Sequence, residues 1–193
     1  KRFKLTTLGI ADHMWDRAIP NTRSIITLNT PWEGFYNIQD FERICRIRKE
    51  FAELDLDGVR ILYGCEAEYD PLRHSIGVSE AVAEQLDFMI VPNSHTHIMM
   101  PSEYYEPHEK HAQFMYQAYM DIISDPLAKY ITAMAHPFEA VCCPYDNKEL
   151  FQYISDDMFR RAFNITAEKG VAVEINLSEL SSLRNEQILN NPR

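Results

Sequence analysis

Apolar and polar positions divide the chain into short continuous apolar runs and longer amphipathic stretches. The runs cover residues 5–11, 59–63, 88–91, 130–135 and 171–175. Several of them are apolar almost throughout, which is typical of parallel strands that are covered on both faces. The pattern therefore predicts five strands of a parallel sheet.

Amphipathic stretches separate these runs and predict helices. They cover residues 38–54, 79–86, 109–123 and 148–169, where apolar side chains recur every three or four positions. Asn37 and Asp40 are placed as a capping pair for the first helix, the last is expected to break near Ser155, and Gly170 is a typical C-terminal stop. Strands that alternate with helices in this way predict an α/β fold, either an open sheet or a barrel, in a single domain over residues 1–193.

Composition and charge exclude several classes of protein. The chain has 193 residues, of which 46% are hydrophobic, and a formal net charge of −10 that disfavours nucleic acid as a partner. No uninterrupted apolar stretch exceeds four residues, so no membrane span is expected. The four cysteines form no C-x-x-C pair, which favours reduced thiols and a cytoplasmic location. Glycine-rich phosphate loops of the Rossmann and P-loop types are missing.

Side chains that can bind a metal ion lie at the C-terminal end of each predicted strand. In chain order they are Asp12 and His13, Glu66 and Glu68, His95 and His97, His136, and finally Glu174 and Asn176. In α/β barrels the strand C-termini form the face that carries the active site, so we expect these side chains to converge. Imidazole and carboxylate groups suit zinc, manganese or iron, and two ions about 3.5–4 Å apart can share a bridging hydroxide.

Some of these residues have structural interpretations of equal standing. Asp12 could cap a helix, and Glu66 and Glu68 alternate with apolar residues as they would on a solvated strand face. His108 and His111 lie three residues apart on a predicted helix, so we expect them at the surface or at the rim of a pocket.

The other histidines also leave alternatives open. His95 and His97 point the same way on an extended chain, so either could bind the ion while His97 could instead support the ligand. His136 is expected in an extended position because Pro137 follows it, and a bond to the backbone is its structural alternative. His74 is expected in a loop.

The ordered set of motifs resembles the PHP (polymerase and histidinol phosphatase) domain family across nearly the whole chain. The segments that carry the resemblance are Ala11-Asp12-His13, Gly64-Cys65-Glu66, residues 87–95, Ala135-His136-Pro137 and Val173-Glu174-Ile175-Asn176. The resemblance implies a distorted (β/α)7 TIM-like barrel with a cluster of two or three divalent ions, zinc, manganese or iron, at the strand C-termini. It also implies the hydrolysis of phosphomonoesters.

Matched to the family's motifs, four residues are implied as metal ligands: His13, Glu66, His95 and His136. Glu66 corresponds to the carboxylate that bridges two ions, and His97 remains an alternative to His95. The family's opening H-x-H and closing D-x-H are absent from the sequence. We therefore expect the terminal strands of the barrel to lie outside these residues, with an inactive member of the family as the alternative.

The resemblance is strongest to the histidinol-phosphatase branch. It implies that Arg184, together with Asn176, holds the phosphate of a small substrate, since the planar guanidinium can donate two hydrogen bonds to phosphate. A hydroxide activated by the metal ions would then attack phosphorus in line. Catalytic roles are assigned to His97 and Asp12, with His97 as a candidate acid for the leaving group.

Two other classes of function remain open. An amidohydrolase-type barrel would use His95 and His97 as ligands, although that family normally has its H-x-H on the first strand. A non-catalytic PHP module would bind metal or a partner protein. The long connection over residues 14–36 contains Trp15, Trp32 and Tyr36, which could form a lid over the site.

Overall fold

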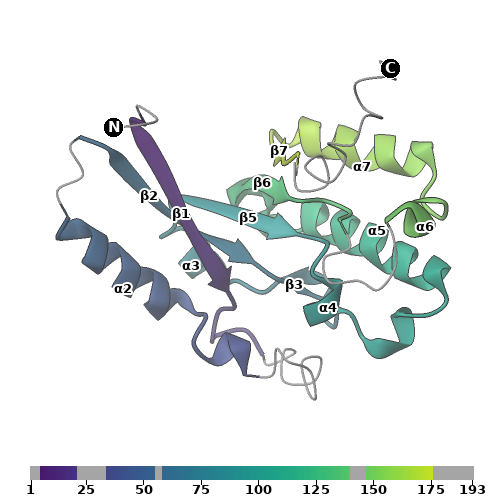
Figure 1. Ribbon diagram of the computed structural model, residues 1–193, viewed down its shortest axis with the longest axis horizontal. Coiled ribbons are helices and arrows are strands. Elements are labelled where there is room, and N and C mark those ends of the chain that lie inside the picture. The colour runs from purple at the N-terminus through teal and green to yellow at the C-terminus, as the bar shows by residue number, and fades with distance from the viewer. Residues whose placement is uncertain (1–4, 21–33, 55–57, 140–146, 176–193) are drawn as a thin grey trace, which may run out of the picture.

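The fold is described from a computed structural model, which covers residues 5–20, 34–54, 58–139 and 147–175. It is a mixed α/β structure built on a parallel sheet (Figure 1). The strands of that sheet are β1 (Thr7–Met14), β2 (Arg60–Ala67), β5 (Phe88–Pro92), β6 (Ile131–Ala135) and β7 (Ala172–Val173). They lie side by side in chain order, and every pair is parallel. The prediction of a parallel five-stranded sheet is confirmed.

Helices connect these strands at the predicted places. The α-helices are α2 (Phe41–Ala52), α3 (Glu80–Ala83), α4 (Thr96–Met99), α5 (His108–Ser124), α6 (Asn147–Phe151) and α7 (Asp156–Glu168). The described ranges also contain three short 3₁₀ turns: η1 (Phe35–Asn37), η2 (Ser102–Tyr104) and η3 (Pro126–Tyr130). None of the helices in the described ranges is long and apolar enough to cross a membrane.

Local chemistry explains where the helices begin and end. The Asp40 carboxylate accepts a hydrogen bond from the backbone N–H of Arg43 and caps α2. The predicted pairing of Asp40 with Asn37 is wrong in this respect, because Asp40 is itself the N-cap and Asn37 lies in η1. Ser155 caps α7 by accepting from Met158, so the expected break separates α6 from α7. Gly170 has a φ of 70°, the left-handed conformation that ends a helix at glycine.

A small antiparallel hairpin was not predicted from the pattern. It consists of β3 (Tyr69–Asp70) and β4 (Ser75–Ile76), which directly follow β2. Strands of two residues leave no alternating pattern to recognise. The hairpin matters because it carries the chain away from the C-terminal end of β2, beside the candidate site.

Two groups of buried apolar side chains hold the layers together. The larger group joins the sheet to α5 and α7 through residues such as Met89, Met134 and Tyr119. In Figure 1, α2 lies beside β1 and β2, whereas α5, α6 and α7 lie beside the other edge of the sheet. The smaller group comprises Trp15, Tyr36, Ile98 and Met99, and it packs η1 against α4. Trp15 and Tyr36 are therefore buried, while Trp32 lies outside the described residues.

Gly64 permits the close approach of β2 and β5. Gly64 pairs with Phe88, and a Cβ atom at Gly64 would lie within 2.6 Å of a Phe88 ring carbon and even closer to its carbonyl oxygen. Gly9 on β1 meets the far end of the same ring, but there a Cβ would lie 3.1 Å from ring carbons only. The backbone conflict is therefore specific to Gly64.

We expect Gly64→Ala to lower the free energy of unfolding by about 1–3 kcal/mol, because the methyl group overpacks a backbone contact that cannot rotate away. Gly9→Ala is the matched control, and its cost should be smaller because the Phe88 ring can shift. Thermal or urea unfolding measures both. Equal stability of the two variants would contradict this account of the β2–β5 contact.

Candidate metal centre

Strand register brings the first two candidate ligands together. His13 on β1 is paired with Glu66 on β2, so their side chains leave neighbouring parallel strands on the same face. His95 follows β5 and begins the short helix α4, and His136 directly follows the last residue of β6. Four adjacent strands thus each contribute one side chain at the same end of the sheet, where the strands have their C-termini.

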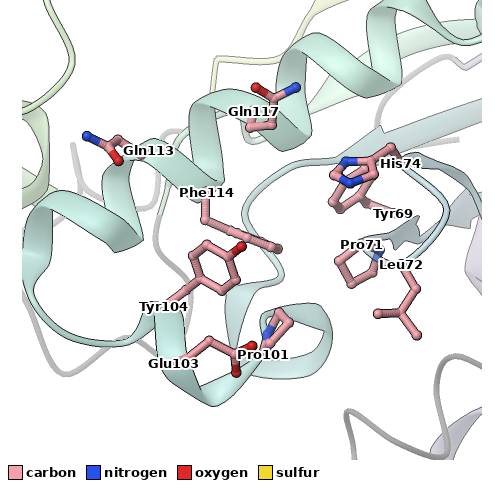
Figure 2. Close-up of a pocket in the computed structure, with 10 residues that line it drawn as sticks. All are labelled: Tyr69, Pro71, Leu72, His74, Pro101, Glu103, Tyr104, Gln113, Phe114 and Gln117. Carbon is pink, nitrogen blue, oxygen red and sulfur yellow. The ribbon is translucent and has the colours of Figure 1, made fainter.

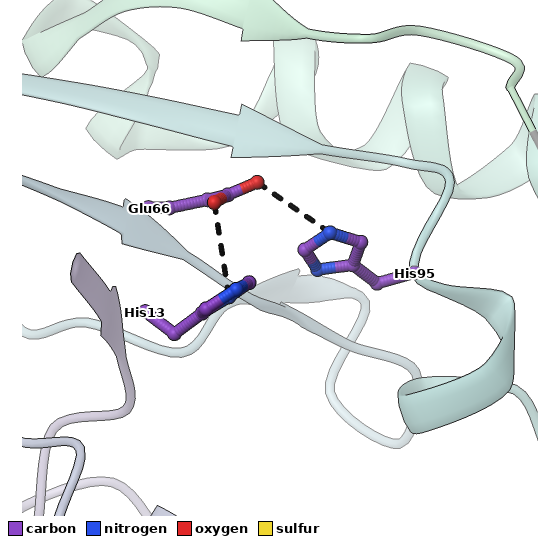
Figure 3. Close-up of side chains that lie close together, drawn as sticks. All are labelled: His13, Glu66 and His95. Carbon is purple, nitrogen blue, oxygen red and sulfur yellow. Dashed lines mark ion pairs between the residues drawn. The ribbon is translucent and has the colours of Figure 1, made fainter. Parts of the chain in front are cut away.

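Glu66 lies among three imidazoles. Its Oε2 is 3.7 Å from His13 Nδ1, and its Oε1 is 3.5 Å from His95 Nε2 and 3.0 Å from His136 Nε2. Figure 3 shows the ion pairs from the two Glu66 oxygens, one to the His13 ring and the other to the His95 ring. Ligand atoms of His13, Glu66 and His95 all lie within 4.8 Å of one another, so this group could hold a metal ion. The ring of His136 extends the cluster, since it packs 5.2 Å from the His95 ring.

A second carboxylate lies beneath this group. Glu68 is fully buried, and its oxygens lie 3.0 Å from His13 Nδ1 and 2.9 Å from His95 Nδ1. The hydroxyl of the buried Tyr36 also donates to Glu68. The Glu68 carboxylate is therefore held by three donors, and it has the partners that a buried charge requires.

Glu68 and Ser94 orient the imidazoles. His95 donates from Nδ1 to Glu68, which leaves Nε2 directed at Glu66. His136 has the same arrangement, with Ser94 Oγ 2.6 Å from Nδ1 and Glu66 at Nε2. A partner at one ring nitrogen fixes the tautomer and the direction of the other nitrogen, as in metal sites where a carboxylate supports a histidine ligand.

The charges of the cluster shift its titration. Burial would raise the pKa of Glu68, but the His95 charge and the hydrogen bonds from His13 and His95 outweigh burial and lower it. The hydrogen bond to Glu68 raises the pKa of His13. Burial opposes the protonation of His136, yet its hydrogen bond with Glu66 leaves the pKa of His136 raised. Without a cation, the carboxylates thus favour the protonated forms of His13 and His136.

Asp12 does not lie with this group. Its carboxylate accepts from Arg43 Nε on α2 and from the backbone N–H of His13. Successive residues of a strand point to opposite faces, so the strand that aims His13 at the cluster aims Asp12 at the helix. The Arg43 ion pair is the role the structure shows for Asp12, and its catalytic role stays a prediction.

Of the three remaining predicted site residues, one lies beside the cluster and two lie outside the described residues. The half-buried His97 lies on α4, with its ring 5.6 Å from that of His95 and edge-on to it. The position beside His95 is compatible with the alternative in which His97 supports a metal ligand. His95 is the histidine that is grouped with His13 and Glu66. Asn176 and Arg184 lie outside the described residues.

His136 adopts a conformation that the sequence did not indicate. An extended backbone was expected before Pro137, but the φ of His136 is 26°, in the left-handed half of the map. Two contacts hold it there: its backbone N–H donates to Glu174 Oε2 at 2.9 Å, and its ring meets Ser94. Strained backbone at a cluster of polar side chains is typical of functional sites. Glu174 thus contributes through the backbone of His136.

The structure decides the positions of three residues that the sequence left open, missed or misplaced. The sequence allows Glu68 either a functional role or a solvated strand face, and the structure shows it fully buried. Ser94 carried no signal apart from its position before His95. His111 was expected at the surface or a rim, but it is fully buried in α5, where its ring lies 6.0 Å from that of Tyr105. His74, expected in a loop, lies between β3 and β4 and is exposed.

Comparison of the sequence with protein-family models finds no match, and comparison with curated proteins finds none either. The resemblance to the PHP family therefore depends on the motifs in the sequence. The geometry adds that residues from these motifs, His13, Glu66, His95 and His136, lie together.

Replacing Glu68 with glutamine is expected to weaken divalent metal binding about 10–100-fold, the usual cost of removing a partner that orients a histidine ligand. Zinc or manganese titration by calorimetry measures this. Glu168→Gln, on the exposed side of α7, is the matched control and should bind metal like the parent protein. Unchanged affinity in a folded Glu68→Gln protein would contradict the orienting role.

The metal-free protein should lose stability as the pH rises from about 6 to 8. The pKa values of His13 and His136 are raised above 6.5 in the fold, so the stability they contribute is fully present below that pH and is lost as the pH passes the raised values. Melting temperatures in chelator measure this loss. Added metal should reverse the trend, because ligands bind metal deprotonated. A chelated protein whose melting temperature rises over this interval would contradict the assignment.

Proposed function

We propose that this protein is a metal-dependent phosphoesterase that hydrolyses a small phosphomonoester, as the histidinol-phosphatase branch of the PHP family does. One observation carries the proposal: a single carboxylate, Glu66, faces imidazoles from three other strand ends with its two oxygens directed to different sides. A carboxylate in that position suits a bridge between two ions, and paired ions suit phosphate-ester hydrolysis.

The residues present fit such ions. His13, Glu66 and His95 form the first set of donors, and Glu66 with His136 forms the start of a second. Nitrogen and oxygen donors of this kind suit zinc, manganese or iron, and two or three ions are proposed. When bound, the ions supply a nucleophilic hydroxide near neutral pH and stabilise charge on phosphoryl oxygens.

The protein's own side chains would orient the ligands and handle protons. Glu68 and Ser94 hold the Nδ1 atoms of His95 and His136, which keeps the Nε2 atoms directed at Glu66. His97, whose ring lies beside His95, is the proposed acid for the leaving group. Arg184 and Asn176 remain the proposed phosphate contacts, and Asp12 retains only a proposed catalytic role.

The finer features of the fold belong to the same proposal. Parallel strands that neighbour each other in chain order, with functional side chains at their C-terminal ends, support a distorted (β/α)7 barrel. A cytoplasmic location and a small phosphorylated substrate complete the proposal, and the net charge of −10 supports the absence of nucleic acid from its partners.

Hydrolysis of p-nitrophenyl phosphate by the purified protein tests the proposal. Activity should vanish in chelator and return with manganese or zinc. Glu66→Gln should lose more activity than the roughly 10–100-fold expected for a supporting residue. Glu168→Gln, remote from the cluster, should keep the parent rate.

The other outcomes identify the alternatives. Cleavage of p-nitrophenyl esters or amides without phosphatase activity would favour an amidohydrolase-type function. Fewer than two bound ions per chain and no hydrolysis would favour a non-catalytic metal-binding module. Phosphatase activity that ignores chelation would contradict the mechanism.

A further inference from the structure

A second cavity lies outside the metal centre, between the β3–β4 hairpin and α5. It has a volume of about 300 Å³, at the lower end of the range for small-molecule sites. Figure 2 shows two groups of side chains facing each other across it: Tyr104 and Phe114 on one side, and Leu72 and His74 on the other. Tyr69 follows Glu68 in the chain, and it lines this cavity as well as a smaller one beside Glu68 and His95.

Aromatic rings form a continuous wall of this cavity. The Tyr104 and Phe114 rings are 5.2 Å apart and tilted by 50°, and the Tyr69 ring meets Phe114 edge-on at 6.0 Å. Tyr104 and Leu72 are exposed, at 38% and 57%, so apolar surface is left open to an incoming molecule. Aromatic faces carry negative electrostatic potential, which attracts a cation placed over them.

The charged side chains around the cavity also favour a cation over an anion. Among the described residues that line it, none is lysine or arginine, and the exposed Glu103 lies next to Tyr104 at its edge. At the other end, the Asp121 carboxylate accepts a hydrogen bond from Tyr69 at 2.5 Å and lies 2.8 Å from His74 Nδ1. An anion would find aromatic faces and a carboxylate there, which repel it.

We propose that this cavity binds a small organic ammonium cation of about the size of choline. The quaternary head would lie against the rings of Tyr104 and Phe114, with Glu103 as the counter-charge, and the apolar remainder would contact Leu72. A quaternary ammonium group has no N–H to donate, so aromatic faces and a carboxylate meet its requirements fully. This inference does not depend on the proposed phosphoesterase function.

Calorimetric titration of the full chain with choline chloride, against 3,3-dimethylbutan-1-ol, tests the proposal. The alcohol has the same shape without the charge, and sodium chloride keeps the ionic strength equal. Choline should bind about tenfold tighter than the alcohol, a ratio that corresponds to about 1.4 kcal/mol. Equal binding of the two, tighter binding of the alcohol, or no choline binding up to tens of millimolar would overturn the proposal.

Variants of the lining residues test whether choline binds in this cavity. Tyr104→Leu keeps apolar volume but removes the ring, and Glu103→Gln removes the counter-charge; each should reduce the preference for choline. Tyr153→Leu is the matched control, because Tyr153 is 40% exposed and does not line the cavity. If Tyr104→Leu does not fold, Glu103→Gln decides, and an unchanged preference in that variant overturns the proposal. Glu66→Gln should still bind choline, which separates this site from the metal centre.

Discussion

The buried charge of Glu68 is the constraint on which the candidate site depends. A carboxylate with no exposed surface loses several kcal/mol of hydration unless charges or hydrogen bonds of the protein replace the water. Here His13, His95 and Tyr36 supply those bonds. Holding Glu68 charged therefore fixes two imidazoles. The Nε2 of His95 then faces a second carboxylate, Glu66, and the His13 Nδ1 that binds Glu68 lies 3.7 Å from the same carboxylate. The electrostatic requirement of one side chain thus organises the cluster above it.

Parallel pairing turns this local requirement into a site. Because neighbouring strands run in the same direction, the residues at the C-terminal ends of β1, β2, β5 and β6 all emerge at one end of the sheet. The pairing of His13 with Glu66 sets the position of the first two, and Ser94 connects the end of β5 to His136 after β6. A shift of one residue in β1 would bring Asp12 to the cluster and turn His13 toward α2.

The sequence predicts the five strands of the parallel sheet and the longer helices well because each has a strong local signal, whereas the hairpin of β3 and β4 has none. Continuous apolar runs identify the strands. Ser155 identifies the break between α6 and α7, because its hydroxyl caps α7 by accepting from the backbone N–H three residues later. Burial depth has no such signal. The period of two places Glu66 and Glu68 on one face but does not say which face is covered, and Tyr36, which helps to bury Glu68, is 32 residues away. The depth of His111 in α5 was missed for the same reason.

The alternation of side chains between the two faces of β2 also decides which metal-binding atoms the site offers. Cys65 lies between Gly64 and Glu66 on β2, is fully buried, and points to the opposite face of the sheet. Burial raises the pKa of its thiol, and the charges of Glu68 and Glu66 raise it further, so both its orientation and its protonation separate this thiol from the cluster in the metal-free protein. The cluster is left with imidazole nitrogen and carboxylate oxygen, the donors that favour borderline and hard divalent ions over thiophilic ones. Hard ions in turn suit oxygen-rich substrates, and phosphate monoesters are such substrates.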